Sequence, residues 1–326
     1  MVTAEPLVIE TPELRLCATS DPGHALVEEF YAGFDRAFVL ANEKESLEGI
    51  RQCLQLNASA DGERLARRWG RVREYVSVAD AKDRVIGGAN FIVSATQPAG
   101  NGTAAPAILV HLNYVYVLPE ARGAGHLRRI VEAVARAAST FAASRPSAPL
   151  SLLQRLFGRS RAPWPRPLIF IEQNDPYRLS AEDYAADTAQ AGIDQFTRIA
   201  VWSALGARVV DFPYVQPALS QEQEPDPNLV LAVMGCDGAS LPAALLKAHL
   251  ERFFAISVLK GRELNTSPPA CDQIAALQRM AKAGKSVALL ALPKDRLLAA
   301  GKARATGTAA LHDNLRAFLA AAQQAR

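Results

Sequence analysis

The segment Val115–His126 constrains this chain more than any other, because an apolar strand pattern ends there in a Pro-Glu turn followed by a glycine loop. The loop, Arg122-Gly-Ala-Gly125, leads directly into a helical pattern from Leu127 to Ala142. A helix N-terminus attracts anions through its unpaired N–H groups and partial positive charge. Glycines allow the backbone to approach such an anion closely. We therefore expect a phosphorylated ligand at this turn.

The composition is that of a soluble globular enzyme. The 326 residues are 49% hydrophobic and 21% charged, which suits one large domain or one domain with a sizeable extension. A net charge of +3 is too weak to indicate a nucleic-acid partner. The four cysteines are widely spaced, so we expect no disulfide and no metal site. We see no leader peptide or membrane-spanning stretch and expect a cytoplasmic protein without a membrane partner.

The spacing of apolar residues predicts an α/β (α+β) chain in two parts. The strands expected in residues 1–238 are Leu14–Ala18, Tyr75–Ala79, Val85–Ser94, Ile108–Val117, Leu168–Ile171, Val209–Val210 and Leu229–Met234. Residues 239–326 form a mainly helical extension with helices expected over Leu241–Leu259, Cys271–Ala283 and Gly307–Gln324, and with Ser286–Leu292 as an alternative short strand. The apolar faces of the extension pack either across the first part or in a homodimer.

A basic, proline-rich insertion occupies residues 145–167. It carries arginines but no acidic residue. One interpretation is a solvated surface insertion. The other is a lid that reaches towards a polyanionic ligand. Its apolar patch is too short to favour a membrane-surface helix.

Two common phosphate-binding motifs do not fit the glycine loop. A dinucleotide-binding fingerprint needs a third glycine where Arg128 stands, and it follows the first strand of its sheet. A P-loop needs Gly-Lys-Ser/Thr after the glycines, which is absent. A nicotinamide-dependent enzyme is therefore the least favoured of the three functions considered for this chain.

The turn instead resembles the pyrophosphate-binding motif of the Gcn5-related N-acetyltransferase (GNAT) superfamily. Val117-x-Pro119-Glu120 is followed by Arg122-x-x-Gly125-x-Leu127, and the order of elements over roughly residues 10–236 is similar. The resemblance implies a GNAT-type mixed, largely antiparallel sheet flanked by helices, with acetyl-CoA as donor. It implies that strand backbone pairs with the pantetheine arm and that the loop wraps the pyrophosphate. The implied cofactor-binding residues are Val115, Tyr116, Val117, Arg122, Gly123, Ala124, Gly125, His126 and Leu127.

Two residues depart from that pattern. Leu127 replaces the last small residue of the motif, so the turn must tolerate a branched side chain. Trp202 stands where many relatives carry a tyrosine that protonates the leaving thiolate. An indole N–H is no useful acid. The usual general acid is therefore missing, or another residue takes its role.

Three residues are the acid–base candidates. Glu172, at the end of the strand opposite the motif strand, is a candidate base or a solvated strand-end carboxylate. His111 is a second candidate base or a hydrogen-bonded core histidine. Tyr214 is the best substitute acid or a packing tyrosine. The candidate substrate-binding residues are Asn113, Asn174 and Trp202.

Strict alternation along the motif strand makes a further prediction. It places His111 and Asn113 on the same face as Val115 and Val117.

The sequence thus predicts an N-acyltransferase that moves acetyl from acetyl-CoA to a small-molecule or peptide amine by direct attack. The alternative is a non-catalytic acyl-CoA-binding or scaffold module of the same fold.

Overall fold

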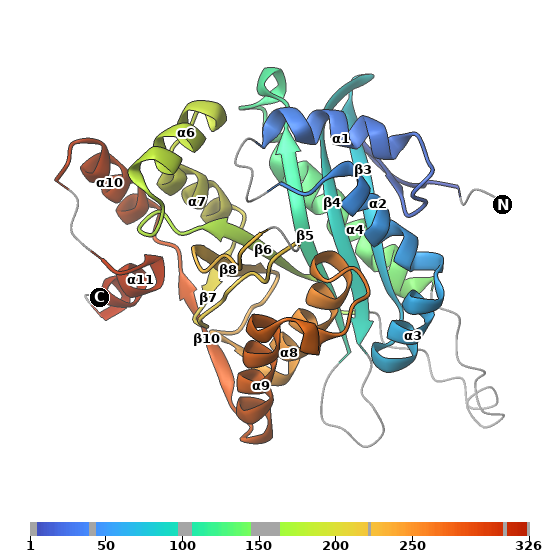
Figure 1. The fold of residues 1–326 in the computed structure, drawn as a ribbon. Helices are drawn as coiled ribbons and strands as arrows, with labels where there is room; N and C mark the ends of the chain where they lie inside the picture. Colours follow the sequence, from blue (N-terminus) through green and yellow to red (C-terminus); the bar gives the residue numbers. More distant parts are fainter. Residues whose placement is uncertain are drawn as a thin grey trace.

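A ten-stranded mixed sheet forms the centre of the molecule (Figure 1). The computed structural model describes residues 5–38, 44–96, 106–144, 164–220, 223–308 and 312–324. The strands lie side by side in the order β1-β2-β3-β4-β5-β6-β8-β7-β10-β9. Their bounds are β1 Leu7–Thr11, β2 Leu14–Thr19, β3 Val72–Ala81, β4 Arg84–Thr96, β5 Ala107–Val117, β6 Leu168–Asn174, β7 Arg208–Val210, β8 Leu229–Met234, β9 Ser240–Pro242 and β10 Ser286–Ala291. The expected mixed, largely antiparallel sheet is confirmed, and β1 is a strand that the sequence reading missed.

Helices cover both faces of this sheet. One face packs against α4 (His126–Ala143), α7 (Gln195–Ala204), α10 (Lys294–Ala305) and α11 (Leu315–Gln324). The other face packs against α1 (Leu26–Ala37), α2 (Leu47–Gln55), α3 (Ala60–Trp69), α8 (Ala243–Phe253) and α9 (Pro268–Lys282). In Figure 1, α1 and α2 lie over the N-terminal strands, and α4 lies behind them. No helix among the described residues is long and apolar enough to cross a membrane.

β5 and β6 are parallel neighbours that soon separate. Only three residue pairs join them, from Leu109–Leu168 to His111–Phe170. β5 then continues to Val117 without a partner on that side, while β6 turns to pair with β8 along its whole length. The unpaired backbone of β5 beyond His111 therefore borders an opening within the sheet.

A bulge in β5 overturns the predicted alternation. Tyr114 pairs with Asn90 and Leu112 with Phe91, which leaves Asn113 as an extra residue. A bulge of this kind exchanges the faces that follow it. Val115 consequently packs towards α4, whereas Asn113 bonds Ser257 on the opposite side.

His111 lies on the side of Asn113, stacked on Phe253 of α8. The expectation that His111 and Asn113 share a face with Val115 and Val117 was therefore wrong.

The C-terminal residues add strands as well as helices to the fold. β10 pairs antiparallel with β7, and β9 pairs with β10, so the sheet continues beyond the strands expected in residues 1–238. The alternative prediction of a short strand over Ser286–Leu292 is confirmed by β10, Ser286–Ala291. The predicted helix Leu241–Leu259 begins only after β9 and ends in a π-helical turn, Phe254–Val258.

The single helix predicted over Gly307–Gln324 was also wrong, since α10 ends at Ala305 and α11 begins at Leu315. The sequence reading missed α3, α6 (Ala181–Ala191) and α10. Most of the basic insertion, residues 145–163, lies outside the described residues.

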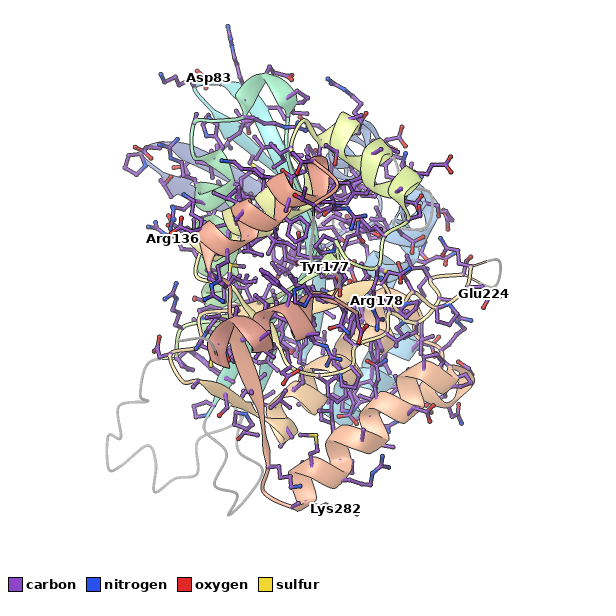
Figure 2. The ribbon with its side chains drawn as sticks, turned by 90° about the vertical axis from the view of Figure 1, so that its left-hand side faces the viewer. Asp83, Arg136, Tyr177, Arg178, Glu224 and Lys282 are labelled. Atoms are coloured by element: carbon purple, nitrogen blue, oxygen red, sulfur yellow. The ribbon has the colours of Figure 1, made fainter. Side chains whose placement is uncertain are left out.

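Asp175, just after β6, anchors the last helix. Its buried carboxylate accepts hydrogen bonds from the Leu315 N–H at 3.0 and 2.8 Å and from the Tyr177 N–H at 3.0 Å. Tyr177, labelled in Figure 2, packs against Phe196 and Phe318. A side chain 140 residues away thus caps the start of α11.

We expect Asp175→Ala to lower the free energy of unfolding by about 2–3 kcal/mol, because buried N–H groups lose their acceptor. Urea denaturation measures this. The exposed Asp237, changed to alanine, is the control and should shift stability by less than about 0.5 kcal/mol. Equal effects in the two variants would contradict the capping role.

Candidate active site

The opening between β5 and β6 is an outer cavity of about 500 Å³. Glu172 and Gln173 of β6 line one side, and residues of α6 and α7, including Trp202, line another. The predicted cofactor-binding residues that line it are Val115, Tyr116, Val117, Arg122, Gly123, Gly125, His126 and Leu127. Ala124 is the one predicted loop residue absent from this wall. The sequence motif and the cavity therefore coincide.

The glycine loop leaves its backbone open to the cavity. Gly123 and Gly125 have φ of +83° and +77°, and a Cβ on either would meet no atom within 4 Å. Gly125 precedes α4 without a side-chain cap, and the first helical bond runs from the Arg129 N–H to the Gly125 carbonyl at 3.4 Å. The N–H groups of residues 126–128 precede that bond, so the loop presents donors and a positive helix end to an anion.

Arg122 fastens this loop to the opposite wall. Its Nε donates to the Val117 carbonyl at 3.2 Å, and Nη1 donates to the carbonyl of Ala191, the last residue of α6, at 2.6 Å. The Val117 carbonyl is therefore already engaged by the protein. The Tyr116 hydroxyl bonds the Phe30 carbonyl at 3.1 Å, which directs that side chain under α1 and away from the loop.

Glu172 lies where the outer cavity meets a smaller inner one of about 100 Å³, and it lines both. The Tyr214 hydroxyl donates a hydrogen bond to Oε1 of Glu172. Nε2 of His111 lies 3.5 Å from Oε2 of the same carboxylate. The three acid–base candidates, distant in sequence, thus meet at one point.

A second histidine, His249 of α8, extends this cluster. Its Nε2 lies 3.0 Å from Nδ1 of His111, and both rings are buried. Burial, and then the neighbouring His111, lower the pKa of His249 well below its usual value, so this ring is neutral. The sequence reading missed His249 because nothing in its local pattern separates it from a core position of α8.

Tyr214 and His111 contact Glu172, but neither lines the inner or the outer cavity. Burial raises the pKa of Tyr214 well above its usual value, and the Glu172 carboxylate raises it further. The phenol therefore keeps its proton and holds the carboxylate in place. This position does not favour the direct acid role considered for Tyr214 from the sequence.

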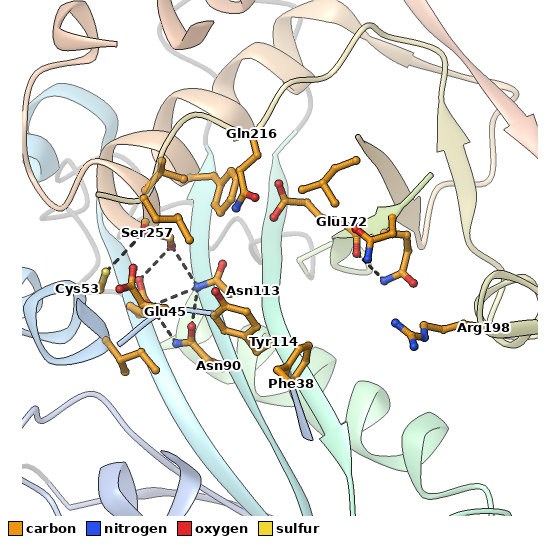
Figure 3. A pocket seen from close by; sticks show the side chains of 18 residues that line it. Phe38, Glu45, Cys53, Asn90, Asn113, Tyr114, Glu172, Arg198, Gln216 and Ser257 are labelled. Atoms are coloured by element: carbon orange, nitrogen blue, oxygen red, sulfur yellow. Dashed lines mark hydrogen bonds between the residues drawn. The ribbon is translucent and has the colours of Figure 1, made fainter. Parts of the chain in front are cut away.

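The inner cavity holds further polar groups, shown in Figure 3. Asn113 and Asn174, predicted to bind substrate, line it, whereas Trp202 lines only the outer cavity. Glu74 of β3 and Ser257 of the π-helical turn also line it, and sequence reasoning missed both. Glu74 directly precedes the predicted strand Tyr75–Ala79. An acidic residue at the start of a strand was the available signal.

Burial raises the pKa of the Glu74 carboxyl to about 7, despite hydrogen bonds from Asn90 and Ser257 that act in the opposite direction. The side chain is 1% exposed. A carboxyl with this pKa changes protonation near neutral pH, which is common at functional sites.

No protein-family model and no curated protein sequence matches this chain. Among solved structures, it is similar to a Salmonella typhimurium acetyltransferase that modifies the N-terminal serine of ribosomal protein L7/L12, at 11% identity over 71% of this chain and 100% of that one, with a TM-score of 0.33. It is similar to a Streptococcus pneumoniae GNAT-family acetyltransferase, at 10% identity over 71% and 98%, with a TM-score of 0.31.

A putative Salmonella typhimurium acetyltransferase, solved with its cofactor acetyl-CoA, is 12% identical over 70% and 96%, with a TM-score of 0.29. The mixed, largely antiparallel sheet agrees with the sheet that the sequence resemblance to the Gcn5-related N-acetyltransferases implied. The geometry of the cleft decides what the site can bind.

The buried Glu74 makes stability depend on pH. An unfolded glutamate ionises near pH 4.5, whereas folded Glu74 keeps its proton up to about pH 7, so the folded protein loses stability as pH rises through this window. We expect Glu74→Gln to gain roughly 2 kcal/mol relative to the unchanged protein between pH 5 and pH 8.

Urea denaturation at both pH values measures the difference. Glu251→Gln removes another largely buried carboxylate, which pairs with Lys247 at 2.8 Å, and should not reproduce the gain. A Glu74→Gln difference that stays constant with pH would show that the carboxyl ionises normally.

Proposed function

We propose that this protein is an acyl-CoA-dependent N-acyltransferase that transfers acetyl from acetyl-CoA to an amine by direct attack. One observation carries the proposal. The cleft between the parted strands β5 and β6 leads from an uncapped, glycine-lined helix N-terminus to the half-buried Glu172 carboxylate, which Tyr214 bonds and beside which His111 lies. An anion site and a proton acceptor thus share one channel.

The channel suits the parts of CoA in order. The pyrophosphate fits the open N–H groups of the loop at Gly123 and Gly125. The pantetheine arm carries amides, which pair with the unpartnered backbone of β5 near Val115. With a volume of about 500 Å³, the outer cavity is within the usual range of small-molecule sites. The thioester then lies near Glu172, where the inner cavity begins.

The chemistry assigned to Glu172 is removal of a proton from the acceptor. The amine nitrogen attacks the thioester carbonyl carbon, the C–N bond forms, and the C–S bond breaks to release CoA as its thiolate. The proton lost by the nitrogen passes to Glu172. Tyr214 and His111 are positioning residues that orient this carboxylate, and they touch neither reactant.

Trp202 does not supply the acid. Its side chain is 5% exposed, packs with the core of α7 and α4, and forms part of the outer wall. An indole N–H donates a hydrogen bond but does not release its proton in this range of pH. Trp202 therefore shapes the wall beside the acyl donor.

Gly125→Ala tests the donor site. A methyl group would project into the open space at φ +77° and crowd a bound pyrophosphate. We expect roughly tenfold weaker CoA binding, measured by calorimetry and by a smaller rise in melting temperature with CoA.

Gly284→Ala is the matched control. Gly284 has φ of +64° and equally open surroundings, but it follows α9 away from the cleft. It should bind CoA like the unchanged protein. Equal weakening in both variants, or no rise in melting temperature with CoA in the unchanged protein, would count against the donor site.

Glu172→Gln tests the acceptor chemistry. General-base catalysis contributes about 10²–10⁴-fold, so we expect kcat/KM for the amine to fall by at least about 10² with CoA affinity unchanged. Tyr214→Phe keeps the carboxylate and loses one charge-assisted bond, for an expected loss of about tenfold.

A Tyr214→Phe loss as large as that of Glu172→Gln would place the phenol itself in the reaction. Tight CoA binding without acetylation of any amine in a broad panel would favour the non-catalytic acyl-CoA-binding module.

A further inference from the structure

The far end of the inner cavity contains a buried carboxylate surrounded by donors from three elements. Glu74 accepts hydrogen bonds from Asn90 of β4 at 2.9 Å, Asn113 of the β5 bulge at 3.3 Å and Ser257 of the π-helical turn at 3.1 Å. Asn90, Asn113 and Ser257 converge in Figure 3, on the opposite side of the cavity from Arg198. The bulge and the π-helical turn are both local irregularities, and such features often shape functional sites.

This polar end has unused acceptors. An ionised carboxylate offers about four acceptor positions, and three donors reach Glu74. Oδ1 of Asn113 is buried and has no hydrogen-bond partner among the described residues. A buried acceptor without a donor is costly. The cavity therefore lacks a donor group at this end, which a bound ligand would supply.

The charges around the cavity favour a cation. Glu45 is paired with Lys260 at 2.7 Å, and Arg198 is paired with Asp187 at 2.7 Å. Burial raises the pKa of the neighbouring Cys53 thiol well above its usual value, which keeps it neutral. Among the described lining groups, the carboxyls of Glu74 and Glu172 thus have no Lys or Arg partner.

Apolar side chains share the cavity wall with polar ones such as Gln173, Asn174 and Gln216. The apolar and aromatic lining side chains include Phe38, Ile50, Tyr114, Leu219, Leu229 and Phe253. Such walls suit a short chain of methylene groups, and aromatic faces tolerate a nearby ammonium. A volume of about 100 Å³ suits a small acceptor.

We propose that the acceptor is a short aliphatic diamine, whose distal ammonium is bound by Glu74 and Oδ1 of Asn113 while its proximal amine reacts beside Glu172. The inference rests on the proposed N-acyltransferase function and specifies the class of its acceptor. Ser257, which comes from the C-terminal part of the chain, completes the diamine site by holding Glu74.

The proposal has a pH signature. Because burial raises the pKa of Glu74 to about 7, the carboxyl is mostly protonated at pH 6 and mostly ionised at pH 8. A diamine stays doubly charged over this range, as lysine does. Ionised Glu74 binds the distal ammonium, so diamine affinity should rise about tenfold from pH 6 to pH 8.

The first experiment measures initial rates with acetyl-CoA and paired diamines and monoamines of three to six carbons. In the unchanged protein, kcat/KM for the best diamine should exceed that of the monoamine of equal length by about tenfold or more. In Glu74→Gln this ratio should fall to within about twofold. Glu251→Gln, outside the cavity, should keep the full ratio. A ratio unchanged by Glu74→Gln, or no preference for diamines, would overturn the proposal.

The second experiment needs neither turnover nor a variant. Calorimetry measures binding of the same diamine and monoamine to the CoA-bound protein at pH 6 and pH 8. The rise in affinity with pH should appear for the diamine only, and a rise shared by the monoamine would overturn the proposal. If no amine is acetylated but the diamine binds with this signature, the proposed function fails while the diamine site stands.

Discussion

The parting of β5 from β6 is the constraint on which the rest of the site depends. Three residue pairs fix the two strands together, and beyond His111 their backbones face a cavity instead of each other. Unpaired backbone inside a sheet is costly unless something else bonds to it. The same parting leaves Glu172, which follows the last β5–β6 pair, on the cavity wall. The outer cavity and the position of the Glu172 carboxylate thus have a single structural origin.

The C-terminal residues are part of this site as well as part of the sheet. His249 and Phe253 of α8 pack against His111, and Ser257 bonds both Glu74 and Asn113. Phe253 and Ser257 form part of the wall of the narrow inner cavity, which lies beside the wider outer one. A region that the sequence presented as an extension therefore helps to shape the inner cavity.

The sequence allowed the position of the glycine-lined cavity to be predicted, because its signals are local. A strand, a Pro-Glu turn and two glycines before a helix are contiguous, and the cavity lies where they predicted it. The polar end of the inner cavity could not be read in the same way. Glu74, Asn113 and Ser257 come from three distant segments, and the bulge at Asn113 invalidates alternation without any mark in the sequence. The sequence did not decide whether the segment that forms β10 is a helix or a strand, because its alanines suit a helix. Its pairing with the edge of β7 makes it a strand.

The position of Ser257 and His249 late in the chain has a consequence for synthesis on the ribosome. The strands β1 to β6, the glycine loop and α4 are complete about 75 residues before His249 leaves the exit tunnel. A nascent chain therefore carries the glycine loop before it carries α8, whose Phe253 stacks on His111. Truncated translation products that end before α8 would expose Phe170 and Leu109, which α8 and the π-helical turn bury in the finished protein. Such products would present an apolar surface to chaperones and proteases, which would limit the accumulation of chains that have the glycine loop without the inner cavity.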